Sequence, residues 1–292
     1  MKKHTNALRA AVVATVAALG MGLGSAPATA APIVPLPEFQ NMPGMATNTP
    51  GGKELVTFGD SFSAHKGARP SDAGQVPWVT NCAADKLNWS HLVAQDLGKT
   101  LGDWTCNGTS VHLPLYLETA IKYGDLGPNT KEVVLMYGGL DPFQWADAAQ
   151  EAQAAGSVQN VTIFRQYIKT IIDRIREVAP QARVTLTSYL EYMSNEQWCP
   201  VNAPGVSTPM TIPGANLVQE KWRDNLRNAA QANNAHFVDV YEASKGHGTC
   251  NPDPAQRWAV GLVDLQAPHT MVNHPTDAGQ RGMANIITEG LR

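Results

Sequence analysis

Residues 54–63 read ELVTFGDSFS, an apolar run that passes directly into a turn. The run from Glu54 to Phe58 has the length and composition of a strand buried on both faces. Gly59 permits a tight turn, and a helix beginning after Ser61 would aim backbone N–H groups at anything bonded to the Ser61 oxygen. Ser61 is therefore a candidate nucleophile and oxyanion donor, with a simple helix cap as the alternative.

Three further apolar runs have the same character. They extend over residues 132–137, 183–188 and 236–240. Between them lie segments with helical periodicity. One such segment runs from Val161 to Val178, where Pro180 stops the pattern. Another is marked by the apolar positions Val218, Trp222, Leu226 and Ala229.

Helices that alternate with buried strands predict a parallel sheet covered on both faces by right-handed crossovers. We therefore expect a single α/β domain, a three-layer α/β/α sandwich of flavodoxin-like plan. Ligands of such sheets bind beyond the carboxyl ends of the strands, which is where Ser61 falls.

The chain begins with the pattern of a signal peptide. Basic residues up to Arg9 precede an apolar stretch that ends near Leu23, and a small-x-small cleavage site ends at Ala30. The stretch is too short and too rich in Ala and Gly for a comfortable membrane span, and an uncleaved anchor is the alternative. We assign residues 1–30 to a signal peptide, 31–51 to a Pro-rich leader and 52–292 to the folded domain.

The charge balance argues against some partners. The formal net charge is −3, and it becomes more negative once the basic residues of the signal peptide are removed. Without a Lys/Arg cluster, the chain has no electrostatic footprint for nucleic acid or for anionic membranes. No paired His and Asp residues stand at metal-ligand spacing, so we expect no catalytic metal and no cofactor.

All four cysteines lie in the mature part: Cys82, Cys106, Cys199 and Cys250. An even number in an exported chain predicts two disulfides, and three pairings are open. We favour Cys82 with Cys106 and Cys199 with Cys250, because each would staple an irregular segment next to the proposed site.

Irregular segments also hold candidate lining residues. Residues 192–214 contain four prolines and no periodicity, which indicates a functional or stapled loop. Four aromatic residues in predicted loops would either line an acyl or sugar groove or pack against their own loops. They are Trp78, Phe143, Trp145 and Trp198.

The motifs taken together resemble the SGNH, or GDSL-type, hydrolase family over most of the mature chain. The segment around Ser61 is similar to the family's first block, Gly108 to its second-block glycine, and His274 to its fifth-block histidine. The cysteine placement is similar to that of secreted actinobacterial esterases and lipases of the family. The resemblance implies that Ser61 is the nucleophile, His274 the general base, and the N–H groups of Ser61 and Gly108 the oxyanion hole.

The chain departs from the family pattern at two positions. Leu140 stands where the third block has an oxyanion-hole Asn, and Asn107 is the nearest replacement donor by sequence. Met271 stands where the fifth block has its acid, so we expect a Ser-His dyad in which the carbonyl of Met271 or a neighbour orients His274. Asp264 is the competing acid.

Two histidines are candidates for the general base, and the residues that come after each of them in the chain decide between the two. His269 is the rival to His274, but it lacks a helix start behind it, whereas Pro275 is expected as the first residue of the last helix.

The resemblance implies a serine ester hydrolase that works through an acyl-serine intermediate. The signal peptide predicts a secreted or cell-envelope location, and we expect a monomer. Its substrates would be small-molecule or lipid esters, including acylated glycolipids or sugars of the cell envelope. Two alternatives remain open: an acyltransferase to a sugar acceptor, and a degenerate member that binds a glycan or lipid without turning it over.

Overall fold

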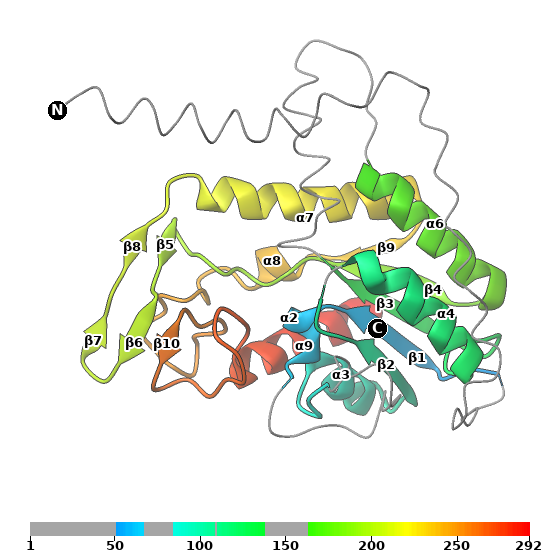
Figure 1. Cartoon of the computed structure of the whole chain (residues 1–292), viewed down its shortest axis with the longest axis horizontal. Helices are drawn as coiled ribbons and strands as arrows, with labels where there is room; N and C mark the ends of the chain where they lie inside the picture. The colour runs from blue at the N-terminus through cyan, green and yellow to red at the C-terminus, as the bar shows by residue number, and fades with distance from the viewer. Residues whose placement is uncertain (1–50, 67–83, 109, 138–162) are drawn as a thin grey trace, which may run out of the picture. The chain divides into compact units, whose positions relative to one another are not determined.

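The protein, seen in a computed structural model, is described over residues 51–66, 84–108, 110–137 and 163–292 (Figure 1). The predicted signal peptide and all but the last residue of the predicted leader lie outside these ranges. So do Trp78, Cys82, Leu140, Phe143 and Trp145.

Within the described residues, five parallel strands form the main sheet in the order β2-β1-β3-β4-β9. They are β1 Leu55–Gly59, β2 Leu101–Thr105, β3 Glu132–Met136, β4 Arg183–Thr187 and β9 His236–Val238. Counted along the chain this is the order 2-1-3-4-5 of the flavodoxin-like plan, which confirms the predicted architecture. The chain reverses its direction of travel across the sheet beside β1, and Ser61 follows that strand.

The edge strand β2 is the strand that the apolar pattern does not predict. Its Asp103 is buried and accepts hydrogen bonds from Asn88 Nδ2 at 2.8 Å and Thr105 Oγ1 at 2.7 Å. Polar groups that satisfy one another replace the continuous apolar run here, so the period-based signal is weak.

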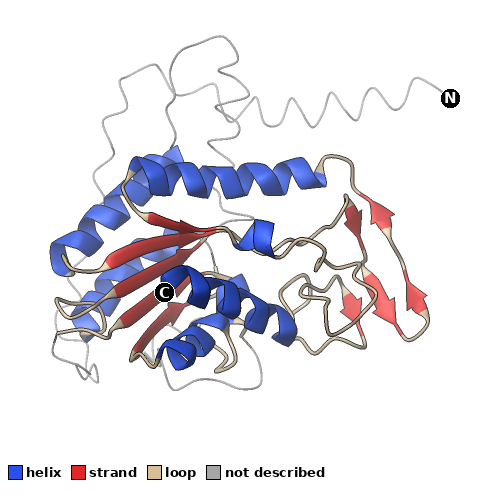
Figure 2. Ribbon diagram, turned by 180° about the vertical axis from the view of Figure 1, so that it is seen from behind, coloured by secondary structure: helices blue, strands red, loops and turns tan. Residues whose placement is uncertain are grey.

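Helices cover both faces of the sheet (Figure 2). One layer contains α3 Trp89–Leu97 and α9 Asp277–Leu291, and the other contains α4 Leu113–Tyr123, α6 Ile163–Val178 and α7 Ala215–Ala232. Successive strand residues point to opposite faces of the sheet. Leu55 and Val134 pack against α3 and α9, and Val56 and Val133 pack against the other helices. No helix of the described part is long and apolar enough to span a membrane.

Three shorter helices complete this part of the fold. They are α2 Ser61–Ala64, the 3₁₀ turn η1 Ser110–His112, and α8 Val240–Ala243. The helix expected after the first strand is thus present and begins at Ser61.

The start of the last helix differs from the prediction. Pro275 is not its first residue: α9 begins at Asp277, and Thr276 is the N-cap, whose Oγ1 accepts a hydrogen bond from the Gly279 N–H at 2.9 Å. A threonine hydroxyl satisfies an end group of the helix that proline cannot, so the cap lies one residue beyond the proline.

The segment predicted as irregular contains short strands. We call residues 192–214 and 247–276 together the outer lobe. Its strands are β5 Gln197–Trp198, β6 Val201–Ala203, β7 Val206–Ser207, β8 Met210–Thr211 and β10 Val263–Asp264. The predicted Cys199–Cys250 disulfide is confirmed and joins the two segments of the lobe. Because Cys82 lies outside the described residues, its pairing with Cys106 stays a prediction.

Candidate active site

Ser61 is the first residue of α2, directly beyond β1. The helix is capped by Asp60, whose carboxylate accepts a hydrogen bond from the Phe62 N–H at 3.0 Å and another from the Tyr189 hydroxyl. The first N–H groups of a helix have no intrahelical acceptor, so the backbone leaves the Ser61 N–H for a ligand. Asp60 therefore holds the turn, the structural role expected of a capping carboxylate.

Gly59 gives the helix room to approach the strands. A Cβ at this position would lie 2.2 Å from Ser63 Oγ and 3.1 Å from the Met136 carbonyl oxygen. The need for glycine thus comes from close approach of α2 to the sheet.

His274 is the partner of Ser61. Its Nε2 lies 2.7 Å from Ser61 Oγ, and its Nδ1 lies 2.7 Å from the carbonyl oxygen of Val272. A carbonyl oxygen can only accept, so Nδ1 carries the proton and Nε2 accepts the Ser61 hydroxyl proton. The orienting carbonyl belongs to Val272 and not to Met271, because the ring reaches back two residues along its own loop.

The backbone of the His274 loop is hydrogen-bonded to the neighbouring segment of the outer lobe. Val260 N–H donates to the His274 carbonyl at 3.1 Å, and Asn273 N–H donates to the Gly261 carbonyl at 2.8 Å. Asn273 has a left-handed backbone, with φ of 56°, and its Oδ1 accepts from the Tyr192 hydroxyl at 2.8 Å. These contacts fix the residue that precedes the histidine.

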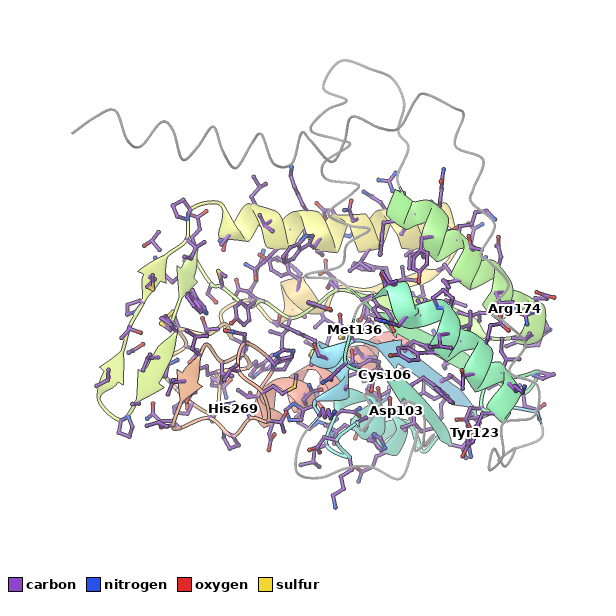
Figure 3. All side chains as sticks on the ribbon, viewed as in Figure 1. Asp103, Cys106, Tyr123, Met136, Arg174 and His269 are labelled. Carbon is purple, nitrogen blue, oxygen red and sulfur yellow. A yellow bond between two sulfur atoms is a disulfide. The ribbon has the colours of Figure 1, made fainter. Side chains whose placement is uncertain are left out.

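The alternative acid, Asp264, and the alternative base, His269, both make contacts away from the Ser61–His274 pair. Asp264 is buried and binds Arg257 Nη1 at 2.5 Å, so it does not orient His274. His269 lies in the outer lobe, where its Nδ1 is 2.8 Å from the Ala267 carbonyl oxygen (Figure 3). Among the residues that the structure describes, no carboxylate hydrogen-bonds Nδ1 of His274.

His65 is a residue that sequence reasoning leaves without a role. It is buried at the end of α2, its Nε2 lies 2.8 Å from Asp277 Oδ1, and its carbonyl oxygen accepts from Thr270 Oγ1 at 3.1 Å. Thr270 and Asp277 flank His274, so His65 connects the serine helix to both ends of the histidine loop. No local motif marks such a long-range contact.

Burial lowers the pKa of the His274 imidazole below its usual range. The Val272 carbonyl opposes this shift because it accepts from the protonated ring as well, and the electrostatic effect of the nearby His65 ring lowers the pKa of His274 further. The ring is therefore neutral near pH 7, as a general base must be.

A cavity of about 870 Å³ opens beside Ser61 and His274. Most of its lining side chains are apolar or aromatic, and they come from α7, from the outer lobe and from the loop after β4. Among them are Tyr189, Leu190, Tyr192, Met193, Trp198, Ile212, Val218, Trp222 and Leu226. Trp198 thus lines the cavity, as one of the two sequence-based readings expected.

The apolar face of α7 divides between two environments. Ala229 is buried in the core and Val218 and Trp222 line the cavity, whereas Leu226 lies between them, buried in the core and also lining the cavity. Periodicity alone does not distinguish a helix face that meets a sheet from one that meets a cavity.

The predicted oxyanion donors lie as follows. Gly108 lines the cavity with φ of +137°, a conformation that favours glycine. Asn107 is not among the lining residues, and its Nδ2 lies 4.0 Å from Met271 Sδ. A donor role for Asn107 stays a prediction. In the described part of the chain, no three His, Cys, Asp or Glu side chains are grouped as metal ligands.

Comparisons with known proteins show the family of the chain. The family described as GDSL-like lipase/acylhydrolase matches residues 57–281. A protein named Lipase 2 from Streptomyces coelicolor is 28% identical over 312 residues, covering 98% of this chain and 98% of its own. An esterase from Streptomyces scabiei is 25% identical and covers 100% of this chain and 97% of its own. The crystal structure of an extracellular lipase from Streptomyces rimosus superposes with a TM-score of 0.56 at 18% identity, covering 81% of this chain and 98% of that one, and shows the shared fold.

Proposed function

The chain belongs to the GDSL-like lipase/acylhydrolase family, and from that premise we propose that this carboxylic ester hydrolase works through an acyl-serine intermediate formed on Ser61. The observation that carries the proposal is the paired contact of His274, 2.7 Å to Ser61 Oγ on one ring nitrogen and 2.7 Å to the Val272 carbonyl on the other. A serine hydroxyl needs such a neutral imidazole to accept its proton at neutral pH.

The reaction follows from the positions of the protons. As Ser61 Oγ bonds to the ester carbonyl carbon, its proton passes to His274 Nε2, and the carbonyl oxygen becomes an oxyanion. The N–H groups of Ser61 and Gly108 hold this oxyanion. The imidazolium then gives its Nε2 proton to the leaving alcohol oxygen as the carbon–oxygen bond breaks. In the second half, water loses a proton to Nε2 as its oxygen bonds to the acyl carbon. The bond from that carbon to Ser61 Oγ then breaks, and Oγ takes the proton back from Nε2, which releases the free acid.

The orienting group is a neutral carbonyl in place of a carboxylate. It fixes the tautomer of His274, because only Nδ1–H can donate to Val272. It carries no full charge, so it stabilises the imidazolium less than an aspartate would. We therefore propose a dyad enzyme with a two-N–H oxyanion hole, to which Asn107 is a candidate third donor.

The cavity supports an apolar acyl group as the part of the substrate that lies beside Ser61. Its lining includes Trp198, Trp222 and Leu226 and few charged side chains. The relatives' names, lipase and esterase, support lipid esters as the substrate class. We place acylated glycolipids and sugars of the cell envelope within that class.

Export of the mature chain is part of the proposal. It is supported by the signal-like pattern of residues 1–30 and by the Cys199–Cys250 disulfide, since disulfides persist in oxidising compartments. The similarity to an extracellular lipase points the same way.

Covalent labelling with a fluorophosphonate probe tests the proposal. We expect labelling of the wild type, none in Ser61→Ala, and a sharp fall in His274→Ala, with His269→Ala as the matched control that keeps full labelling. Hydrolysis of a short p-nitrophenyl ester should follow the same order. A wild type that neither takes the label nor cleaves the ester would show that the protein is a binder. Sugar acceptors that divert acyl product from free acid to ester would show an acyltransferase.

A further inference from the structure

The small sheet of the outer lobe has apolar side chains on one face. Its strands β10, β6 and β7 are paired in that order, and lie together at one end of the described domain (Figure 1). Residues directly opposite in register share a face. The register places four apolar residues on the same face: Val201, Ala203, Val206 and Val263.

This apolar face is the exposed one. Val206 is 52% exposed and Val263 43%, and Leu265, next in the same alternation, is 71% exposed. The opposite face carries Asn202 and Asp264, which are 1% and 6% exposed, and the exposed Ser207, whose hydroxyl donates to Asn202 Oδ1. A sheet with one solvated face ordinarily places its polar residues outward, so the polarity of this sheet is reversed.

The segments that form this sheet and the loop leading to His274 carry no exposed Asp, Glu, Lys or Arg side chain. Residues 197–214 contain no Asp, Glu, Lys or Arg, and residues 258–276 contain only Asp264. That carboxylate is buried in its ion pair with Arg257. Covering these segments with an apolar medium would therefore not remove water from any Lys, Arg, Asp or Glu side chain.

The exposed apolar residues continue to the mouth of the cavity. Leu262 and Val272 are each 49% exposed, and the hydrogen bond from Asn273 N–H to the Gly261 carbonyl holds their two segments side by side. Val272 also lines the cavity and supplies the carbonyl that orients His274. The exposed apolar surface and the cavity thus meet at one residue.

We propose that this surface, made of Val206, Leu262, Val263, Leu265 and Val272, docks on the surface of aggregated neutral or zwitterionic lipid. Docking would bring the cavity mouth against the phase that holds an apolar ester, a benefit that rests on the proposed ester hydrolysis. Apolar side chains gain free energy when a lipid surface covers them. Because these segments have no exposed basic residues, anionic lipid should not attract this surface more strongly than neutral lipid.

Vesicle binding tests the docking without catalysis. Full-length protein with Ser61→Ala should sediment with phosphatidylcholine vesicles, and adding Val206→Glu with Leu265→Glu should weaken this binding on the order of tenfold or more. Gln95→Glu, which adds a carboxylate at an exposed site on α3, is the matched control and should bind as before. Binding should be the same at about 0.05 and 0.5 M salt. A need for phosphatidylserine, loss of binding in high salt, or equal binding by the double variant would each overturn the proposal.

Rates on two substrates separate this proposal from the proposed activity. With Ser61 intact, Val206→Glu with Leu265→Glu should hydrolyse a soluble short-chain p-nitrophenyl ester at the wild-type rate, and an emulsified long-chain ester on the order of tenfold more slowly. Equal rates on the emulsion would overturn docking while leaving ester hydrolysis in place. A wild type inactive on both esters would overturn the activity, and vesicle sedimentation would still decide the docking. A wild-type dimer that the two substitutions dissociate would show that a second copy covers the surface, and would also overturn the proposal.

Discussion

Ser61 and His274 are in contact, yet they come from regions that are stabilised by different forces. Ser61 follows β1, all five residues of which are buried between two layers of helices. His274 belongs to the outer lobe, which is held by the Arg257–Asp264 ion pair, the Cys199–Cys250 disulfide and backbone hydrogen bonds. The nucleophile is thus positioned by apolar packing, and the base by individual polar contacts.

This difference has a consequence for mutational tolerance. Apolar cores tolerate substitutions that conserve side-chain volume, because their stability is spread over many weak contacts. A buried charge pair does not accept the loss of one partner, since the other is left without compensation. We therefore expect the histidine half of the site to be the more fragile one.

The largest effect is expected for Asp264→Asn. The change keeps the shape of the side chain but leaves the Arg257 charge buried and unpaired, which costs about 3–5 kcal/mol. The Arg257 carbonyl accepts from Thr276 Oγ1 at 2.9 Å, so the damage should reach the cap that follows His274 and lower kcat. Urea unfolding and ester hydrolysis measure the two effects. A variant with wild-type stability would contradict the role given to this ion pair.

Lowering the pH should abolish activity by protonating His274, in the histidine half of the site. Because the folded pKa of His274 is lowered, kcat/KM should fall about tenfold per pH unit below an apparent pKa that lies under 6.5. The unfolded chain binds this proton more readily than the folded one, so the residue's contribution to stability is present above about pH 6.5 and is lost as pH falls. A pH–rate profile with its acid limb above 6.5 would show that a carboxylate acts on the ring.

A swap in the serine half should have a smaller effect. Leu135→Met on β3, beside Phe58 of β1, conserves volume at a site that is 1% exposed. We expect a loss of stability below about 1.5 kcal/mol and unchanged kcat. Thermal unfolding checks the first value and steady-state kinetics the second. A loss as large as that of Asp264→Asn would remove the contrast between the two regions.

In the histidine half, an effect on the scale of one hydrogen bond is expected for Tyr192→Phe. It removes the hydrogen bond to Asn273 Oδ1, worth about 0.5–1.5 kcal/mol, and loosens the residue before His274. A severalfold fall in kcat at unchanged soluble-ester KM is the expected outcome. Burial raises the pKa of this tyrosine to about 12, so the hydroxyl stays protonated and the effect should not vary below pH 9. A change in KM alone would place Tyr192 in substrate binding.

The same contrast explains what the sequence predicts and what it does not. Four of the five strands of the main sheet, and the helix that ends at Val178, follow from the apolar pattern, and Ser61 follows from its place after the first strand. The contacts of His65, the Arg257–Asp264 pair and the Val272 carbonyl depend on residues brought together by the fold, which no local pattern encodes. The sequence does not predict the outward apolar face of β6 and β10, because these strands have only three and two residues and are too short to show an alternating pattern.

The protonation state of His274 tests the central claim most directly. Nitrogen-15 NMR of the histidine-labelled protein distinguishes a ring protonated at Nδ1 from one protonated at Nε2 and follows its titration. The Ser61–His274–Val272 arrangement predicts a neutral ring at pH 7 with its proton on Nδ1 and a pKa below 6.5. A proton on Nε2, or a pKa above 6.5, would contradict a dyad oriented by a backbone carbonyl.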